Sequence, residues 1–199
     1  SGLEILGIEN KNSFLDKLLF YKDLLIKWNK TYNLTGITDE QDIITHHLLD
    51  CLSVTKFVSA KNIMDVGSGA GLPGLILALC FPDRKITMVD KVGKKTAFIQ
   101  QVIGEFNLNN ARVLNGRVED IKNYKHYDGI ISRAFADMET MIKLTSHLLL
   151  DGANWYGMKS KKSRDSEMIT MKYSYHVDKI DVPHLRAERY LITVVNATN

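Results

Sequence analysis

Short apolar runs of strand length alternate along this chain with segments in which apolar residues recur at helical spacing. The strand-like runs cover residues 63–66, 85–90, 111–115, 127–135 and 154–158. The helical segments lie between them, at residues 75–80, 94–106 and 138–150. Strands and helices in alternation are typical of a doubly wound α/β fold, in which helices cover both faces of a parallel sheet.

Two more strand-like runs, at residues 174–182 and 189–195, close the chain around a short loop. They predict a hairpin at one end of the sheet, so we expect a mostly parallel, seven-stranded sheet. The sequence contains no internal repeat, linker or low-complexity segment that would mark a second domain. We therefore expect all 199 residues to form a single domain, with 59–199 as its α/β core.

Residues 1–58 are expected to form a helical N-terminal extension of that core. Apolar residues repeat at helical spacing from Ser13 to about Lys30, which predicts a first helix. Thr38 and Gln41 have the spacing of a capping box, which predicts the start of a second helix. Two adjacent histidines follow in that second helix.

Composition narrows the possible classes of protein. Hydrophobic residues make up 45% of the chain and charged residues 25%, which suits one sizeable globular core. The net charge of +3 does not by itself indicate a nucleic-acid-binding protein, so any basic surface must be local. Cys51 and Cys80 lack the spacing of a metal site or a disulfide framework, and no apolar run reaches membrane-spanning length. These features favour a cytoplasmic protein without a metal site.

A glycine-rich stretch follows the first strand, and it is the most informative segment for function. Asp65 ends the strand, and glycines then occupy every second position at Gly67, Gly69 and Gly71, just before a new helix. Glycines let the backbone approach a ligand closely, and a helix N-terminus adds unpaired N–H groups. The stretch therefore predicts a site for a nucleotide-like ligand.

Two cofactor classes use such a loop, and the spacing separates them. A dinucleotide fingerprint counted from Gly67 would need a glycine where this chain has Leu72. A match counted from Gly69 places the tight turn two residues too late. Asp65 at the strand end could pair with an amino group, which S-adenosylmethionine carries in its methionine tail. The stretch thus looks like motif I of the Rossmann-like class I methyltransferases.

Other strand ends complete the predicted cofactor site. Asp90 ends the second strand about 20 residues past the glycines, where a carboxylate can accept hydrogen bonds from both ribose hydroxyls of either cofactor. Val118 and Glu119 follow the third strand, where class I methyltransferases commonly contact the adenine. All three residues are therefore candidates for cofactor binding.

Arg133 at the end of the fourth strand is the candidate for the catalytic centre. Methyltransferases of exocyclic amino groups often carry an Asn/Asp-Pro-Pro-aromatic motif here, whereas this chain has Ser132-Arg133-Ala134-Phe135. The acceptor is therefore not expected to be an exocyclic amine. An arginine could instead donate to O6 and N7 of guanine, or it could form a structural ion pair.

Two segments could contact RNA. Residues 28–36 combine aromatic side chains with Lys and Asn, which suits base stacking, or packing of this loop onto the core. The run from Lys159 to Arg164 carries four cations in six residues, and it is either a phosphate-binding patch or a solvated surface.

Five segments together closely resemble the glucose-inhibited division protein B family, whose members methylate N7 of a guanine in bacterial 16S ribosomal RNA. The matching segments are Lys27-Trp28-Asn29-Lys30-x-Tyr32-Asn33-Leu34-Thr35, His47-x-x-Asp50, Asp65-Val66-Gly67-x-Gly69-x-Gly71-Leu72-Pro73-Gly74, Arg117-Val118-Glu119 and Ser132-Arg133-Ala134-Phe135. The resemblance runs from about Phe14 to Val195. The family usually has a glycine after the lysine at 159, whereas this chain has Ser160.

The resemblance implies S-adenosylmethionine as cofactor, with Gly67, Leu72, Val118, Glu119 and Arg133 in contact with it or close by. It also implies 16S ribosomal RNA or the small ribosomal subunit as partner. Guanine N7 has an in-plane lone pair, so it can attack the methyl group without a general base. We expect a monomer.

Four residues are expected to hold the RNA: Asn33, His47, Lys159 and Arg189. Three alternatives stay open at this point. They are a methyltransferase that acts on a small molecule, an NAD-dependent oxidoreductase, and an RNA-binding module without catalysis.

Overall fold

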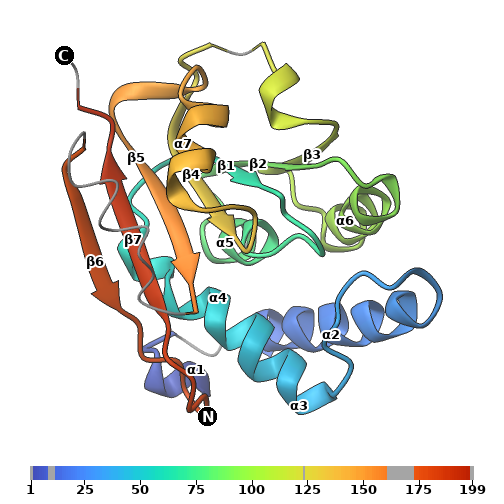
Figure 1. Ribbon diagram of the computed structural model, residues 1–199. Coiled ribbons are helices and arrows are strands. Elements are labelled where there is room, and N and C mark those ends of the chain that lie inside the picture. The colour runs from blue at the N-terminus through green and yellow to red at the C-terminus, as the bar shows by residue number, and fades with distance from the viewer. Residues whose placement is uncertain (1, 9–11, 123, 161–172, 198–199) are drawn as a thin grey trace.

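The computed structural model describes residues 2–8, 12–122, 124–160 and 173–197. Its centre is a twisted seven-stranded sheet in the order β3-β2-β1-β4-β5-β7-β6 (Figure 1). The strands are β1 (Asn62–Val66), β2 (Lys85–Asp90), β3 (Ala111–Asn115), β4 (Tyr127–Arg133), β5 (Leu149–Lys159), β6 (Tyr175–Lys179) and β7 (Tyr190–Val195). All seven coincide with predicted strands, so the expected fold class is confirmed.

Strand direction determines which residues meet at the functional edge of the sheet. β1 pairs in parallel with β2 and β4, and the outer pairs β2–β3 and β4–β5 are also parallel. β7 runs antiparallel to both β5 and β6. The carboxyl ends of five parallel strands therefore share one edge, and the first residues of β7 lie at that same edge.

Helices cover both faces of the sheet. They are α1 (Gly2–Ile5), α2 (Asn12–Tyr32), α3 (Glu40–Asp42), the π-helix η1 (Ile43–Leu49), α4 (Asp50–Ser53), the 3₁₀ helix η2 (Thr55–Phe57), α5 (Gly74–Cys80), α6 (Gly93–Phe106), the 3₁₀ helix η3 (Val118–Asp120) and α7 (Met138–Thr145). None of the helices in the described part of the chain combines the length and the apolar character that a membrane crossing requires.

The alternation of side chains along each strand builds two cores. Ile63 of β1 faces a large cluster formed with α2, α4, α5 and α6. Its neighbour Met64 faces the opposite cluster, which contains α7 and Trp155. Residues on either side of a strand thus pack on different helices, as the period of two requires.

The N-terminal extension packs directly on the cofactor-binding half of the core. Tyr21 of α2 is fully buried, and its ring lies edge-on to Phe98 of α6. The Tyr21 hydroxyl donates a hydrogen bond of 2.8 Å to the carbonyl oxygen of Ala70 in the glycine-rich loop. In Figure 1 the long helix α2 lies beside α6. The extension therefore helps to fix the position of that loop.

Two predicted boundaries are wrong. The second helix is capped by Asp39, whose carboxylate accepts the Asp42 N–H, and not by Thr38. The helix predicted over 138–150 ends at Thr145, and Leu149 already begins β5. Helical periodicity does not distinguish the apolar residues that end α7 from those that begin a buried strand.

Candidate functional site

The glycine-rich loop turns sharply at the end of β1. The N–H groups of Gly67 and Ser68 both donate to the carbonyl oxygen of Val89 in the neighbouring strand, at 2.9 and 3.1 Å. Gly67 has a φ of +67°, and a Cβ there would lie 2.6 Å from the Phe135 ring. Only glycine suits this conformation and this crowding at once.

Gly69 and Gly71 have different surroundings. Gly69 has a φ of +59°, and a Cβ there would meet open space, so this residue faces a cavity. A Cβ on Gly71 would overlap the Leu75 side chain, and Gly71 does not line that cavity. Gly71 therefore lets the loop pack on α5, Gly67 lets Phe135 pack on the loop, and Gly69 leaves room for a ligand.

Asp65 supports the loop from beneath. Contrary to the expectation that it faces the ligand, its side chain is fully buried and lines neither of the two cavities at this edge of the sheet. Oδ2 accepts the Gly74 N–H at 2.9 Å, and Oδ1 has no hydrogen-bond partner among the described residues. Burial raises the pKa of this carboxyl group to about 7. The apolar surroundings at the strand end explain why the carboxylate turns toward the loop backbone.

Asp90 connects the glycine loop to the end of β2. Its Oδ2 accepts the Gly69 N–H and its Oδ1 accepts the Val92 N–H, both at 2.9 Å. Each carboxylate oxygen can accept more than one hydrogen bond. Asp90 also lines a cavity, so it can hold the loop and still accept hydroxyl groups from a ligand.

That cavity has a volume of about 380 Å³, which is within the range of small-molecule sites. Val118 and Glu119 form part of its wall, opposite the loop residue Gly67. Val118 is buried and apolar, whereas Glu119 is partly exposed and lies 3.7 Å from Arg117. Asp90, Val118 and Glu119 are therefore brought together as the sequence predicts, around a space that suits an adenosine. We call it the adenosine cavity.

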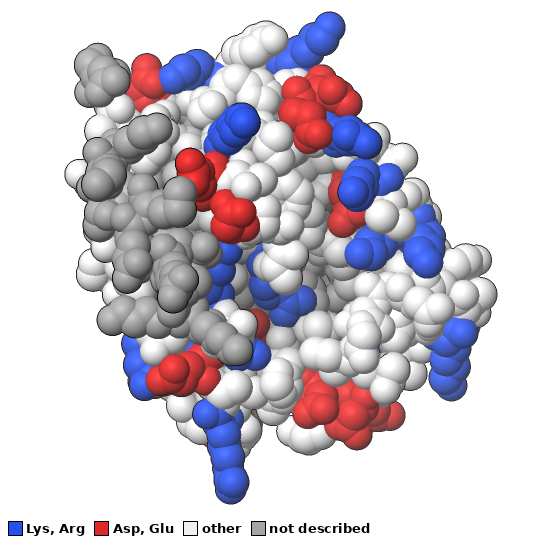
Figure 2. Space-filling view, viewed as in Figure 1, with Lys and Arg blue, Asp and Glu red and all other residues white. Residues whose placement is uncertain are grey.

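A second cavity of about 460 Å³ adjoins it at the same edge of the sheet. Figure 2 shows a hollow near the centre of this face, with Lys and Arg side chains inside it. The predicted site residues that line the second cavity are Gly67, Gly69, Leu72, His47, Arg133, Lys159 and Arg189. We call it the acceptor cavity.

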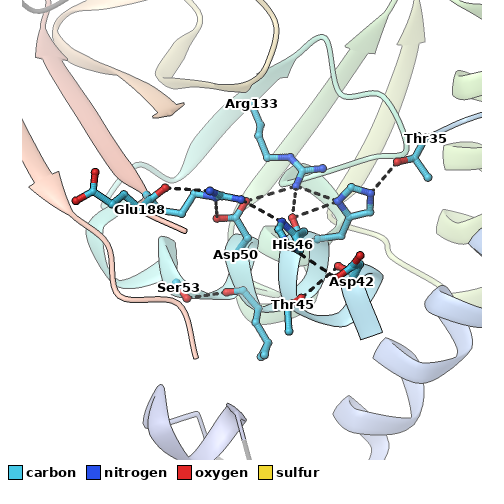
Figure 3. A network of polar contacts seen from close by, with 11 residues as sticks. Thr35, Asp42, Thr45, His46, Asp50, Ser53, Arg133 and Glu188 are labelled. Carbon is cyan, nitrogen blue, oxygen red and sulfur yellow. Dashed lines mark hydrogen bonds and ion pairs between the residues drawn. The ribbon is translucent and has the colours of Figure 1, made fainter. Parts of the chain in front are cut away.

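Arg133 is held by the second helical segment of the extension (Figure 3). Its Nη1 donates to the carbonyl oxygen of His46 at 2.9 Å and lies 3.2 Å from Nδ1 of His47. The same nitrogen lies 3.5 Å from Oδ2 of Asp50. Nε and Nη2 have no partner among the described residues, so three of the five guanidinium N–H donors can serve a ligand.

His47 has partners at both ring nitrogens. Nδ1 lies 3.2 Å from the carbonyl oxygen of His46 and 3.2 Å from Nη1 of Arg133, and Nε2 lies 2.9 Å from the Thr35 hydroxyl. Burial, together with the charge of Arg133, lowers the pKa of His47 to about 4. His47 is therefore a neutral residue that positions Arg133, and both of its ring nitrogens have partners.

Asp50 joins Arg133 to Arg189 at the start of β7. Nε of Arg189 donates to Oδ1 of Asp50 at 3.2 Å, and Nη2 of Arg189 lies 3.3 Å from Nδ1 of His46. The Asp50 side chain is only 6% exposed. No role for Asp50 was predicted from the sequence, although its spacing of three from His47 indicated that both could lie on one side of a helix.

Several polar groups of one short segment face the cavity. His46 and His47 lie in the π-helix η1 (Ile43–Leu49), Asp50 follows as the first residue of α4, and all three contact the arginines. π-Helical turns are often found at functional sites. Within the described residues, no group of three His, Cys, Asp or Glu side chains could hold a metal ion.

The other predicted RNA contacts divide into two places. Nζ of Lys159 donates to the Ala136 carbonyl oxygen at 2.7 Å, and the side chain lines the acceptor cavity. Asn33 lines a separate pocket, which shares only Thr35 with the acceptor cavity. The structure therefore does not bring Asn33 into the acceptor cavity, which His47, Lys159 and Arg189 line. The predicted basic run continues through residues 161–164, which lie outside the described residues.

S-adenosylmethionine fits this arrangement. Gly69 leaves open space where the loop borders the acceptor cavity, and Asp90 offers carboxylate oxygens to ribose hydroxyls. The two cavities lie side by side and share Gly67, Lys95 and Ala134 in their walls. Residues of the adenosine cavity would hold the nucleoside, and the loop would border the methionine tail.

Solved structures with the same fold support this assignment of the fold. A SAM-dependent methyltransferase from Aquifex aeolicus superposes with a TM-score of 0.61 at 12% identity, over 78% of this chain and 93% of that one. At this identity the likeness concerns the fold alone, because one fold can host several activities.

Sequence relatives are much more similar. A protein of Neisseria meningitidis serogroup C named ribosomal RNA small subunit methyltransferase G is 44% identical, over 96% of this chain and 93% of that protein. A protein of the same name from Methylobacillus flagellatus is 40% identical, over 96% and 94%. The family profile described as rRNA small subunit methyltransferase G matches residues 14–192. The chain therefore belongs to the family of rRNA small subunit methyltransferase G, also designated GidB.

Proposed function

We propose that this protein transfers a methyl group from S-adenosylmethionine to N7 of a guanine in 16S ribosomal RNA. Membership of the family supports the substrate class. The choice of N7 as acceptor atom rests on one observation, the contacts that the acidic and basic side chains of the acceptor cavity make with arginine. His46, His47 and Asp50 each already face an arginine N–H. Each carboxylate and imidazole in the described part of that wall is thus already engaged by an arginine, and none stands free as a general base for the acceptor.

An acceptor atom that needs no deprotonation suits such a cavity. When bound, S-adenosylmethionine supplies a methyl group activated by a positively charged sulfur. The N7 lone pair of guanine attacks the methyl carbon in line, the bond from carbon to sulfur breaks, and the positive charge passes to the base. The protein then contributes mainly alignment of donor and acceptor and exclusion of other nucleophiles.

The predicted site residues receive roles within this proposal. Asp90 accepts hydrogen bonds from the ribose hydroxyls, and Val118 and Glu119 border the adenine. Gly67, Gly69, Gly71 and Leu72 shape the loop beside the methionine tail, and Asp65 holds that loop from beneath. Arg133 uses its remaining N–H donors at the catalytic centre, where O6 and N7 of guanine are suitable acceptors.

The RNA is proposed to enter through the acceptor cavity, where His47, Lys159 and Arg189 lie. Asn33 would contact the RNA farther along, beyond Thr35. The substrate is 16S ribosomal RNA, free or within the small ribosomal subunit. We further propose that the chain acts as a monomer and that 1–58 and 59–199 form one domain, since α2 and α6 share a core.

A small-molecule acceptor is less well supported. The fold and the adenosine cavity would suit such an enzyme equally well, but the similar sequences are named for ribosomal RNA. An NAD-dependent oxidoreductase is also less well supported, because the similar sequences are named for ribosomal RNA methylation.

The test is a methyl-transfer assay with labelled S-adenosylmethionine. The acceptors are 16S ribosomal RNA and intact small subunits from cells that lack this protein, and the labelled atom is then mapped. We expect label on guanine N7, lost by at least 100-fold in Arg133→Ala. The control Arg186→Ala removes an equal charge from an exposed position outside both cavities. Cofactor binding without any label in RNA would overturn the proposal and favour the small-molecule alternative.

A further inference from the structure

Lys95 occupies a special position between the two cavities. Of the described residues, only Gly67, Lys95 and Ala134 line both of them. Lys95 is the one member of these three with an ionisable side chain, and it extends from the first turn of α6. It is half-buried, so its ammonium group can reach both cavity and solvent.

The other cations of the acceptor cavity already have protein partners. Arg133 and Arg189 share the Asp50 carboxylate, and Lys159 donates to a backbone carbonyl. Lys95 makes no hydrogen bond or ion pair with any residue in the described ranges. The fold therefore places a positive charge at the junction of the cavities without neutralising it there.

The nature of the ligand follows from the charges nearby. This step rests on the proposed function, in which adenosine occupies one cavity and the methionine tail occupies the other. Because the sulfur links the adenosine to the methionine tail, it would lie near the junction of the two cavities. An ammonium group beside a sulfonium is unfavourable unless an anion joins them. RNA supplies such an anion in every nucleotide.

We propose that Lys95 binds a backbone phosphate of the RNA substrate next to the guanine that is methylated. A lysine is a flexible point charge, which suits a phosphate whose exact position differs between conformations of the RNA. The contact would also couple the two ligands, since the phosphate neutralises Lys95 and removes its repulsion of the sulfonium.

The test measures RNA binding against salt concentration, in the absence of cofactor. Wild type, Lys95→Met, Lys95→Arg and Lys61→Met are titrated with transcribed 16S ribosomal RNA. Each phosphate contact contributes about 0.7 to 0.9 to the slope of log K against log salt. Lys95→Met should lower the slope by about that amount and weaken binding, and Lys95→Arg should restore both. Lys61 lies at the opposite edge of the sheet, before β1, so Lys61→Met should resemble wild type.

A second measurement separates the phosphate from the other anion that Lys95 could bind, the methionine carboxylate. Calorimetric titration with S-adenosylmethionine alone should give equal or tighter binding in Lys95→Met. Weaker cofactor binding, or an unchanged salt slope, would overturn the assignment of Lys95 to RNA. Failure of the wild type to methylate RNA would overturn the proposed function as well. An active wild type with an unchanged slope in Lys95→Met would overturn only this inference.

Discussion

The arrangement of the acceptor cavity depends on one residue, Asp50. It lies between two guanidinium groups, that of Arg133 at the end of β4 and that of Arg189 just before β7. A buried carboxylate of this kind stabilises the fold only while both partners are present, because unpaired buried charges are costly. Its removal should therefore affect both stability and the direction in which Arg133 points.

Asp50→Asn should lower the free energy of unfolding by about 3 kcal/mol, because two half-buried arginines lose the buried negative charge between them. Methyl transfer should fall at least tenfold, since Arg133 is then held only through His46 and His47. Urea denaturation and the labelled-cofactor assay measure the two effects. The control Asp42→Asn removes a carboxylate that is 57% exposed, so stability should change by no more than about 0.5 kcal/mol. Equal effects in both variants would contradict the role of Asp50.

Asp65 makes stability depend on pH. Its pKa is about 7 in the folded protein, against an ordinary value of 3.8 that applies to the unfolded chain, so the folded form holds a proton that the unfolded chain has lost. The contribution of this group therefore falls as pH rises from about 4 and becomes constant above about 7. Relative to wild type, Asp65→Asn should gain about 2 to 3 kcal/mol between pH 5 and pH 8. The free energy of unfolding is measured by urea denaturation at each pH. If it changed with pH equally in wild type and in Asp65→Asn, the prediction would be contradicted.

The positions of some site residues could be predicted from the sequence, and those of others could not. Arg133, Asp90 and Val118 could be predicted because each follows a parallel strand, and such positions meet at one edge. The orientation of Asp65 could not, since it depends on whether the loop backbone or a ligand satisfies the carboxylate. Asp50 was missed because its partner Arg189 is far away in the sequence, and only the fold brings them together.

At the level of secondary-structure elements, α2 packs on the core and also holds the glycine-rich loop through Tyr21. Tyr21→Phe removes the hydrogen bond to the Ala70 carbonyl and leaves a buried acceptor without a donor. Stability should fall by about 1 to 3 kcal/mol, and binding of S-adenosylmethionine should weaken about fivefold because the glycine loop is less well fixed. Thermal unfolding and calorimetry measure these changes.

Tyr156→Phe provides the matched control. Tyr156 is also a buried tyrosine, but its hydroxyl lies near Ser59 and Asn154, away from the loop. This variant should leave cofactor affinity unchanged. A loss of affinity in both variants would mean that the effect of Tyr21 is a general loss of stability.

The elements themselves were largely predictable, whereas their ends were not. The strands follow from short apolar runs between glycines and polar residues, and the order of strands and helices implies the parallel sheet. The π-helix at 43–49 could not be predicted, because no local pattern marks its wider turn, and its partners Arg133 and Arg189 come from distant parts of the sequence. The boundary between α7 and β5 could not be predicted either, because the apolar residues on both sides of it suit a helix and a buried strand equally well.

For the molecule as a whole, the cofactor should act as a stabilising ligand. S-adenosylmethionine at 100 times its dissociation constant adds about 2.7 kcal/mol, which corresponds to a rise in Tm of about 5 to 10 °C for a chain of this size. NADH should cause no such shift, because Leu72 stands where a dinucleotide site requires glycine. A shift with NADH alone would contradict the choice of cofactor. Differential scanning fluorimetry is sufficient for this measurement.

The contact between Asp50 and Arg189 joins residues that are 139 positions apart in the sequence. Such a contact forms only after a large loop has closed, which makes it a late event in folding. During synthesis the glycine loop and the adenosine cavity can therefore be complete while β7 is still being made. A nascent chain would acquire a place for the cofactor first and a functional acceptor cavity only when its last strand has joined the sheet.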